Sequence, residues 1–348
     1  MKEIKINNRL KISKSSRPLI IAEVSANHCG SKKKFLKHIL AAKKCGADLV
    51  KIQTYETDDM LINKNFVIKK GLWKNNNLWK LYQKAQTPYN WHHDAFKLAK
   101  KNDIELFSTP FSIKSLNFLK NFKPNLYKIS SFELTDYNLV NEIAKLKKPI
   151  ILSTGLANIN EINNALKIIR KRHNKIILMY CVSSYPAKLE EINFNKIELL
   201  KEKTGVSNIG FSDHTIGLSA AIASISHGAR IVEKHFKLNG KNQSPDQIFS
   251  INENQIKKLR LEFNNLDKIY SKTVKLETKN SLFFRRSIYA ISDIKRNEKF
   301  SKKNIACFRP FVGLCASNYF NLIGKKSNKN IKKNEVLKKE YINVKNQK

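Results

Sequence analysis

Eight short apolar segments recur in the first two thirds of the chain, and a helical pattern follows most of them. They span residues 18–23, 48–53, 104–109, 126–131, 149–154, 175–182, 208–213 and 230–235. Apolar strands of this kind are typical of parallel sheets buried on both faces, and eight strand–helix units favour a closed barrel. An open doubly wound sheet would instead need a glycine-rich loop after its first strand, and residues 23–30 contain no GxGxxG motif. The sequence therefore predicts an α/β fold, a (β/α)8 TIM barrel.

Helix signals lie between the predicted strands. Apolar residues recur at helical spacing in residues 32–45, and Gly46 supplies a stop. In residues 158–172, Asn158 can cap the first turn, with Glu161 three positions later as in a capping box. Both segments are therefore predicted to be barrel helices.

The chain changes character after residue 270. A polar connector, 271–281, leads to a tail of short apolar pieces, 282–348, in which residues 293–298 are echoed by residues 330–335. We therefore expect a barrel domain of residues 1–270, a linker, and a small β-rich C-terminal domain with a weak internal repeat.

A long insertion, residues 55–101, separates the second and third predicted strands and contains Trp73, Trp79 and Trp91. Loops of this length are usually functional, so the tryptophans could form a lid or a wall of a substrate pocket. Alternatively, they could pin the insertion to the barrel.

The net charge of +38, from 66 Lys and Arg against 28 acids, raises nucleic acid as a partner. The lysines are spread along the chain without a dense basic tract, however, and the abundance of Lys, Asn and Ile fits A/T-rich codons. We therefore expect no nucleic-acid partner, although the positive field could attract an anionic substrate.

Cysteine usage and hydropathy indicate the compartment. The five cysteines form no CxxC pair, which favours reduced thiols. No apolar stretch approaches the roughly 20 residues of a membrane span, and the basic N-terminus lacks the apolar core of a signal peptide. We expect a cytoplasmic protein without a membrane partner.

Two histidines end neighbouring predicted strands. His214 follows Gly210-Phe211-Ser212-Asp213, and His235 follows Glu233-Lys234. Because all strand ends of a parallel barrel face one mouth, both imidazoles could bind a common divalent metal, with carboxylates beside them for acid–base chemistry. The alternative is that each histidine is hydrogen-bonded beneath a loop.

Lysines and hydroxyls surround the same predicted mouth. Lys51 and Lys128 lie inside apolar strands, where a buried ammonium needs a partner. A ring of Ser and Thr at the strand ends would suit a bound phosphate. Alternatively, the hydroxyls cap the following helices, and the lysines pair with Glu23 or Glu133.

At these residues the chain resembles the sialic acid synthase family, which condenses phosphoenolpyruvate with an amino sugar to make nonulosonic acids. The resemblance covers nearly the whole chain, and its tail is similar to the family's antifreeze-like (SAF) domain. The matching stretches are AEVSANHCGS (22–31), VKIQTY (50–55), FSTPF (107–111), YKISSFEL (127–134), ILSTGLA (151–157), GFSDHTIG (210–217), VEKHF (232–236), PDQIFS (245–250), ACFRPFVGL (306–314) and LIGKKSNKNI (322–331).

Within the family, the chain is most similar to the pseudaminic acid synthases. Residues 68–92 and 245–250 carry this likeness, together with Phe132, where the sialic acid branch usually has Gly. Ser184 and Gln247 also depart from the sialic acid pattern. The resemblance therefore implies a 2,4-diacetamido-2,4,6-trideoxy-L-altrose substrate rather than N-acetylmannosamine.

The resemblance also implies roles for single residues. His214 and His235 would bind Mn²⁺ or Mg²⁺. Phosphoenolpyruvate would contact Lys51, Thr109, Lys128, Ser131, Ser153, Ser184 and Ser212. Catalysis would fall to Glu23, Glu133 and Asp246. The sugar would contact Asn27, Gln53, Phe132, Tyr185, Gln247 and, in a domain-swapped homodimer, Arg309 of the partner subunit.

The implied mechanism has the metal polarise the sugar aldehyde, the enol carbon attack it, water add at C2, and phosphate leave by C–O cleavage. Glu23 and Glu133 compete for the acid–base role.

Three alternative functions stay open: an N-acetylneuraminate or legionaminate synthase, a basic nucleic-acid or sugar-binding scaffold without catalysis, and an aldolase with a Schiff base on Lys51 or Lys128.

Overall fold

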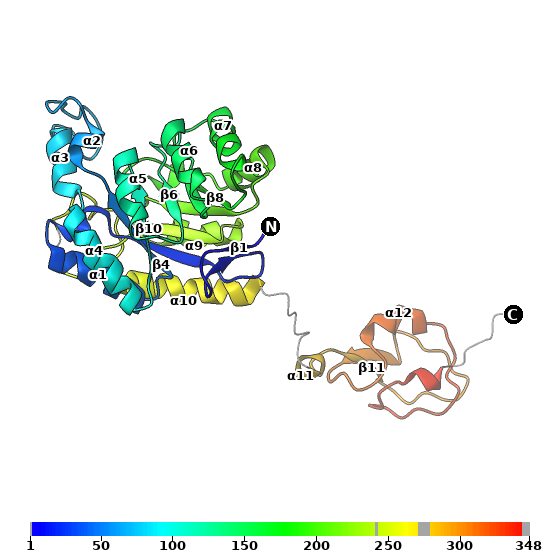
Figure 1. Ribbon diagram of the computed structural model, residues 1–348. Coiled ribbons are helices and arrows are strands. Elements are labelled where there is room, and N and C mark those ends of the chain that lie inside the picture. The colour runs from blue at the N-terminus through cyan, green and yellow to red at the C-terminus, as the bar shows by residue number, and fades with distance from the viewer. Residues whose placement is uncertain (1, 241–242, 271–278, 343–348) are drawn as a thin grey trace. The chain divides into compact units, whose positions relative to one another are not determined.

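The computed structural model describes residues 2–240, 243–270 and 279–342 (Figure 1). The chain divides into two compact units, Met1–Ser271 and Lys272–Lys348. The predicted linker, 271–281, lies outside the described residues as far as residue 278, and so do residues 343–348 of the predicted C-terminal domain. Within the described ranges, no helix is long and apolar enough to cross a membrane.

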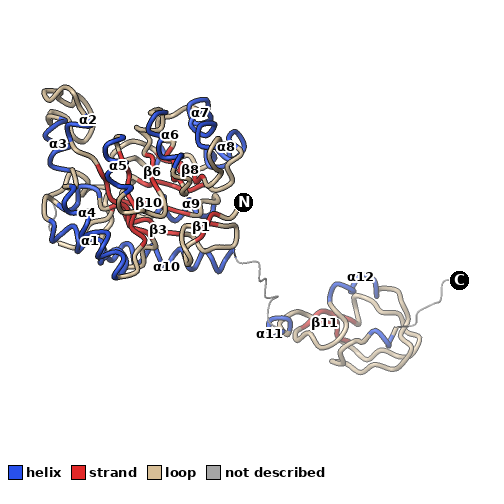
Figure 2. The backbone as a smooth tube through the Cα atoms, viewed as in Figure 1, coloured by secondary structure: helices blue, strands red, loops and turns tan. Residues whose placement is uncertain are grey.

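The first unit is a closed barrel of parallel strands surrounded by helices, which confirms the predicted fold class (Figure 2). The strands are β3 (Leu19–Glu23), β4 (Leu49–Thr54), β5 (Glu105–Pro110), β6 (Tyr127–Ile129), β7 (Ile150–Ser153), β8 (Ile176–Cys181), β9 (Ile209–Asp213) and β10 (Ile231–His235). Each strand pairs with the next along the chain, and β10 closes the barrel onto β3. The strands are buried almost throughout, because their outer faces pack against the helices, which explains their continuous apolar pattern.

A helix that packs on the barrel follows each barrel strand. These helices are α1 (Lys32–Lys44), α4 (Tyr89–Lys101), α5 (Ile113–Lys120), α6 (Tyr137–Lys145), α7 (Ile159–Arg170), α8 (Asn195–Thr204), α9 (Ser219–Ser226) and α10 (Glu253–Tyr270). The predicted capping box of α7 is present, since Asn158 and Glu161 each accept a hydrogen bond from the other's backbone N–H. These local signals start the helices, and their apolar faces fasten them to the barrel.

The insertion after β4 is shorter than the sequence suggests. Helix α4 is the regular barrel helix of this unit, with His92, Ala95 and Ala99 buried. The extra segment is therefore residues 55–88, which carries the short helices α2 (Thr57–Met60) and α3 (Leu78–Ala85).

The amino-terminal end of the barrel is filled with apolar side chains. Ile4, Ile6 and Ile12, from the hairpin of β1 (Ile4–Lys5) and β2 (Lys11–Ile12), pack against barrel residues that include Leu49 and Ile177. Because this end is filled, polar groups of the strands gather at the carboxyl end.

The second unit has its own small core around β11 (Ser287–Ala290) and β12 (Ile305–Phe308), which pair antiparallel. The internal echo corresponds to two matching turns. In each, an asparagine adopts the left-handed conformation (Asn297 and Asn334, both φ 69°), and a glutamate (Glu298 and Glu335) accepts a hydrogen bond from a backbone N–H three residues earlier. Asparagine tolerates this conformation better than most residues, which explains why the two turns share it.

Candidate active site

An ionic network joins three strands at the carboxyl end of the barrel. Lys51 Nζ on β4 lies 2.7 Å from Glu23 Oε2 on β3 and 3.0 Å from Glu233 Oε1 on β10. Ser212 on β9 donates to the same Glu233 oxygen at 3.2 Å. Burial lowers the pKa of Lys51 to about 8, and Glu233 opposes this shift. Burial would raise the pKa of Glu233, but the neighbouring lysines outweigh it and lower that pKa. Each buried charge here depends on its partners.

A second buried lysine has no carboxylate within ion-pair distance in the part of the chain that the structure describes. Lys128 on β6 donates to Ser153 Oγ on β7 at 2.6 Å and to the Ile129 carbonyl oxygen at 3.3 Å. Two buried hydroxyls, Thr109 Oγ1 and Ser183 Oγ, find no hydrogen-bond partner among the described residues. A bound anion such as a phosphate would neutralise this buried cation and accept hydrogen bonds from the unpaired hydroxyls.

The backbone packs closely beside these hydroxyls. Ser131 Oγ accepts a hydrogen bond from the Gly155 N–H at 3.1 Å and lies 3.0 Å from Cys181 Sγ. A Cβ at Gly155 would lie 2.3 Å from Ser183 Oγ and 2.6 Å from Cys181 Sγ. A larger residue here would have to displace these side chains, and sequence reasoning did not single out this position.

The two histidines face each other, with ring centroids 5.6 Å apart. His214 Nδ1 donates to the Val182 carbonyl oxygen at 2.9 Å, which leaves its Nε2 with a free lone pair. His235 Nδ1 is buried without a hydrogen-bond partner among the described residues. This donor set fits a divalent metal held by two imidazoles. Across residues 2–240, 243–270 and 279–342, no group of three or more His, Cys, Asp or Glu could hold a metal, so water and substrate oxygens would supply the other ligands.

A loop after β10 covers one side of the histidines. Its Asp246 Oδ2 lies 3.5 Å from His235 Nδ1. Asn27 donates to the Phe236 carbonyl oxygen at 2.9 Å and to Ser250 Oγ at 2.8 Å, and so ties this loop to the first strand–helix unit. Asn27, predicted to bind sugar, therefore contributes to holding the loop that carries Asp246.

The two carboxylates that competed for the acid–base role lie in different environments. Glu23 Oε2 pairs with Lys51, and Glu23 Oε1 accepts the Ser25 N–H at 2.8 Å. Glu133 forms no ion pair among the described residues and accepts a hydrogen bond from Ser130. Burial raises the pKa of Glu133 to about 7, with Lys128 opposing the shift. Near neutral pH, Glu133 can therefore donate a proton.

The rim of the mouth carries the remaining predicted sugar contacts. Phe132 is 59% exposed, whereas Gln53, Ser184 and Gln247 are half-buried. Tyr185 packs against His214, with ring centroids 4.3 Å apart and the rings tilted by 40°. These side chains come from four different strand–loop junctions at the carboxyl end of the barrel.

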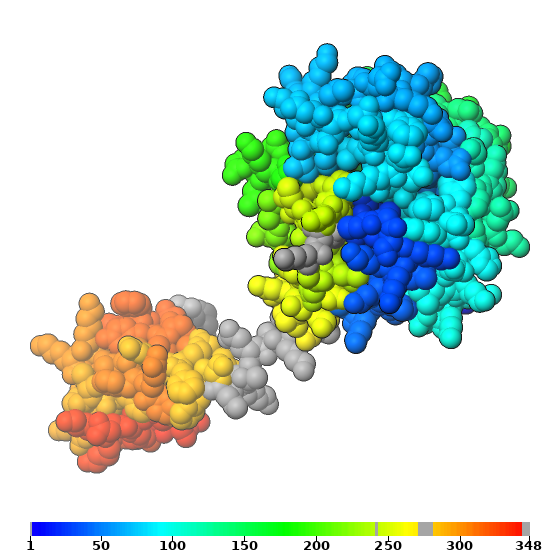
Figure 3. Space-filling view, turned by 90° about the vertical axis from the view of Figure 1, so that its left-hand side faces the viewer, coloured from blue at the N-terminus to red at the C-terminus, as the bar shows by residue number. Residues whose placement is uncertain are grey.

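The three tryptophans of the predicted insertion have three different roles. Trp91 on α4 packs into the core against His28, so it pins the chain. Trp79 is turned outward and donates to Asp58 at 3.1 Å. Trp73 donates to the Pro245 carbonyl oxygen at 3.3 Å and packs on Tyr185 with ring centroids 5.7 Å apart. The insertion therefore reaches the mouth through Trp73, and in Figure 3 its blue surface lies against the yellow loop after β10.

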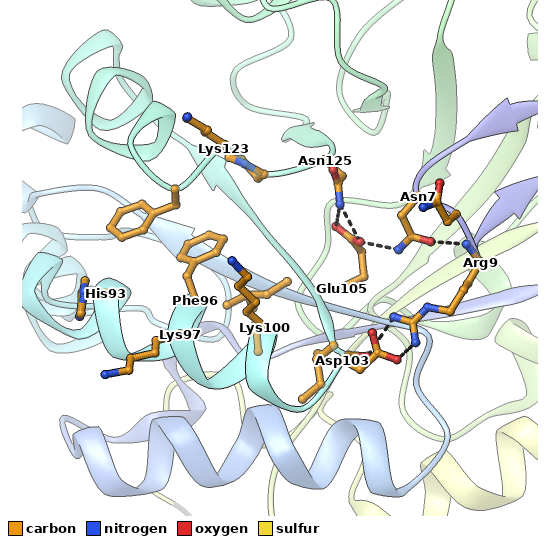
Figure 4. Close-up of a pocket in the computed structure, with 16 residues that line it drawn as sticks. Asn7, Arg9, His93, Phe96, Lys97, Lys100, Asp103, Glu105, Lys123 and Asn125 are labelled. Atoms are coloured by element: carbon orange, nitrogen blue, oxygen red, sulfur yellow. Dashed lines mark hydrogen bonds and ion pairs between the residues drawn. The ribbon is translucent and has the colours of Figure 1, made fainter.

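A cavity of about 630 Å³ lies away from this mouth (Figure 4). It is lined by Asn7 and Arg9 of the N-terminal hairpin and by Glu105, the first residue of β5, so it opens at the amino-terminal end of the barrel. Glu105 is satisfied by amides of Asn7 and Asn125 at 2.6 Å and 3.0 Å. None of the predicted site residues lines this cavity.

Sequence reasoning placed Glu233 at a strand end but gave it no role, although it bridges Lys51 and Ser212. The sequence could have indicated that Glu233 points into the mouth, because it lies two residues before His235 and alternate residues of a strand share a face. Arg309 lies in the second unit and is exposed.

The chain is similar to known proteins over most of its length. Residues 38–275 match the NeuB family, and residues 285–342 match the SAF domain. The chain is 42% identical to a pseudaminic acid synthase of Campylobacter jejuni over 92% of this chain and 95% of the relative. It is 33% identical to an N,N'-diacetyllegionaminic acid synthase of the same bacterium over 92% and 99%. The crystal structure of an N-acetylneuraminic acid synthetase from Leptospira borgpetersenii superposes with a TM-score of 0.72 at 28% identity, covering 80% of this chain and 94% of that one.

Proposed function

The chain belongs to the NeuB family, and we propose that it is a pseudaminic acid synthase. This transferase condenses phosphoenolpyruvate with 2,4-diacetamido-2,4,6-trideoxy-L-altrose and water to give pseudaminic acid and phosphate. The observation that carries the proposal is the pairing, at one barrel mouth, of a buried cationic pocket with two facing imidazoles. The test is phosphate release from phosphoenolpyruvate that requires the sugar and yields a product with the mass of pseudaminic acid. Phosphate release that does not depend on the sugar would contradict the proposal.

Phosphoenolpyruvate is proposed to bind with its phosphate at Lys128. The ammonium there is buried beside Ser153, and Thr109 supplies an unpaired hydroxyl from the adjacent strand. Ser131, Ser184, Ser212 and Lys51 complete the surroundings. Fixed donors on several rigid strands hold the enol carbon in a defined direction, and such orientation can lower a barrier by several kcal/mol.

His214 and His235 are proposed to hold Mn²⁺ or Mg²⁺, which when bound would polarise the aldehyde of the open-chain sugar as a Lewis acid. The protein's own groups handle the protons. Glu133 in its acid form donates a proton to the aldehyde oxygen as the enol carbon attacks. A water then adds at C2, a carboxylate (Glu23 or Asp246) accepts its proton, and phosphate leaves with the bridging oxygen by C–O cleavage.

The pKa of Glu133 makes this assignment testable. Because that pKa is raised to about 7, the acid form is lost as pH rises through neutrality, and kcat should fall above about pH 7. Glu133→Gln is expected to lower kcat by about 10²-fold and to abolish this alkaline limb of the pH profile. Glu142→Gln, on the outer side of α6 beside Lys145, is the matched control and should change neither. A Glu133→Gln enzyme that keeps the wild-type alkaline limb would refute the role.

The aromatic pair of Trp73 and Tyr185 is proposed to form a wall for the sugar. A 6-deoxy sugar presents a methyl group where N-acetylmannosamine presents a hydroxymethyl, and an aromatic wall favours the methyl. Trp73→Ala should therefore reduce the preference for the 6-deoxy sugar about tenfold, measured as the ratio of kcat/KM values, because one such apolar contact is worth about 1–3 kcal/mol. Its KM for phosphoenolpyruvate should stay constant. Trp79→Ala, in the same insertion but turned outward, is the control; equal effects of the two changes would exclude the wall.

A second copy of the chain is proposed to complete the mouth. Large apolar side chains are exposed on the barrel's carboxyl-end loops, including Phe132, Leu156 and Ile216, and separately on the small unit, including Phe308 and Val312. Arg309 lies between the latter two, so a domain-swapped homodimer would bring Arg309 of the partner subunit to the sugar. Mixing Arg309→Ala with His235→Ala chains should then restore activity that neither has alone.

Because phosphoenolpyruvate is a cytoplasmic metabolite, we place the reaction in the cytoplasm.

A further inference from the structure

An ion pair lies directly behind the two histidines. Asp213 precedes His214 at the end of β9, and Lys234 precedes His235 at the end of β10. The two strands pair in parallel with Lys234 opposite Asp213. Both charged side chains have zero exposure to solvent, and their Nζ and Oδ2 atoms are 2.8 Å apart.

The pair also binds the turn that follows β9. Lys234 Nζ donates to the carbonyl oxygen of Thr215, and Asp213 Oδ1 accepts the Thr215 N–H at 2.8 Å. One lysine of β10 is thereby tied to the residues on both sides of His214. These side-chain contacts add to the backbone pairing of β9 and β10 at the strand ends.

The ion pair lies on the outer face of these strands. Ser212 and Glu233 bond to each other on the inner face, with Lys51. Because side chains alternate along a strand, Asp213 and Lys234 share the outer face with Phe211 and Val232, which belong to the apolar layer between barrel and helices. The pair therefore lies outside the mouth and cannot touch a substrate bound there.

Stability alone does not explain charges in such a layer. Removing two charges from water costs about as much as their attraction returns, so apolar residues of similar volume are often equally stable or more so. An ion pair with directed hydrogen bonds instead allows only one relative position of the two strand ends. The candidate metal site depends on the separation of its two imidazoles, because the described residues offer no third protein ligand that could hold the metal.

We propose that Asp213 and Lys234 are positioning residues that set the distance between the His214 and His235 imidazoles, and thereby the metal affinity of the site. This inference rests on the proposed function, in which those histidines bind the metal. It predicts that neutralising the pair loosens the histidines without removing any group that contacts metal or substrate.

The test is Mn²⁺ affinity of the full-length protein, measured by titration calorimetry and by the EPR signal of free Mn²⁺. The variant is Asp213→Asn with Lys234→Met, which leaves no unpaired buried charge and keeps an oxygen to accept the Thr215 N–H. Mn²⁺ binding should weaken about tenfold or more, in the range found for residues that orient metal ligands. Asp213→Asn alone, in which a neutral lysine can still bond the amide, should weaken it in the same direction and replaces the double variant if that does not fold.

The control is a cluster of ion pairs at the other end of the barrel. Asp48 accepts the Ile20 N–H at 2.8 Å and pairs with Arg260 and with the partly exposed Arg17. Asp48→Asn with Arg260→Met should leave Mn²⁺ affinity within about twofold of wild type. Wild-type Mn²⁺ affinity in the Asp213/Lys234 variant, or an equal loss in the control, would overturn the positioning role. If the wild-type protein binds no Mn²⁺, the metal site of the proposed function fails, and the inference fails with it.

Discussion

Replacing His214 or His235 with alanine is expected to lower kcat/KM by about 10³-fold or more, because the loss of a Lewis acid removes several kcal/mol of transition-state stabilisation. The two ring centroids are 5.6 Å apart, and His235 Nδ1 is buried without a hydrogen bond among the described residues, with Asp246 Oδ2 3.5 Å away. Neither side chain contributes to the apolar layer around the barrel. The fold should therefore survive, and circular dichroism and Tm should stay close to wild type.

His93→Ala is the matched control, because His93 lies on the exposed side of α4 beside Asp94. It should leave activity unchanged. A chelator should inactivate the wild-type enzyme, and added Mn²⁺ should restore it. Substantial activity in either mouth variant, or trapping of a pyruvyl adduct on Lys51 by borohydride, would instead favour the Schiff-base aldolase.

Lys128→Met is expected to raise the KM for phosphoenolpyruvate by about 10²-fold, since a charge-assisted hydrogen bond to phosphate is worth roughly 1.5–3 kcal/mol. The same change should leave the free energy of unfolding constant or increase it. Lys128 is buried beside Ser153 without a direct ion-pair partner in the described part of the chain, so until an anion binds its charge interacts only at longer range with Glu133 and Glu233.

Lys51→Met should behave in the opposite way. Lys51 pairs with Glu23 and Glu233, so its removal leaves two buried carboxylates facing each other and should destabilise the protein by roughly 3–5 kcal/mol. Urea unfolding of both variants, together with their KM values, separates the two roles. A Lys128→Met enzyme that is strongly destabilised but binds phosphoenolpyruvate normally would show that Lys128 is structural.

The barrel and the mouth could be predicted because their signals are local. Each strand is a short apolar run, and parallel strands must end at one face, so His214, His235, Lys51 and Lys128 had to lie together once the barrel was assumed. The resemblance to known synthases then gave the chemistry of that face.

Pairing between side chains could not be predicted, because it depends on which residues share a face across strands. Both lysines were possible partners of a glutamate, yet only Lys51 has carboxylates within 3.0 Å in the described structure. The bridging role of Glu233 and the tight fit at Gly155 are likewise three-dimensional facts.

The insertion shows the limit of pattern reading. Its last part looked like more loop, but residues 89–101 form α4, because Ala95 and Ala99 pack on the barrel. Three tryptophans of equal appearance in sequence divide between the core, the surface and the mouth. The sequence shows that the insertion contains tryptophans, whereas tertiary contacts decide where each side chain packs.

The most direct measurement of the central claim is a competition in one reaction. The purified protein receives phosphoenolpyruvate, Mn²⁺ and equal concentrations of 2,4-diacetamido-2,4,6-trideoxy-L-altrose and N-acetylmannosamine, and the products are separated by mass. We predict that pseudaminic acid forms with stoichiometric phosphate and exceeds N-acetylneuraminic acid by about 10²-fold, the discrimination that a few pocket contacts can supply. Equal amounts of the two acids, or an excess of N-acetylneuraminic acid, would contradict the assignment.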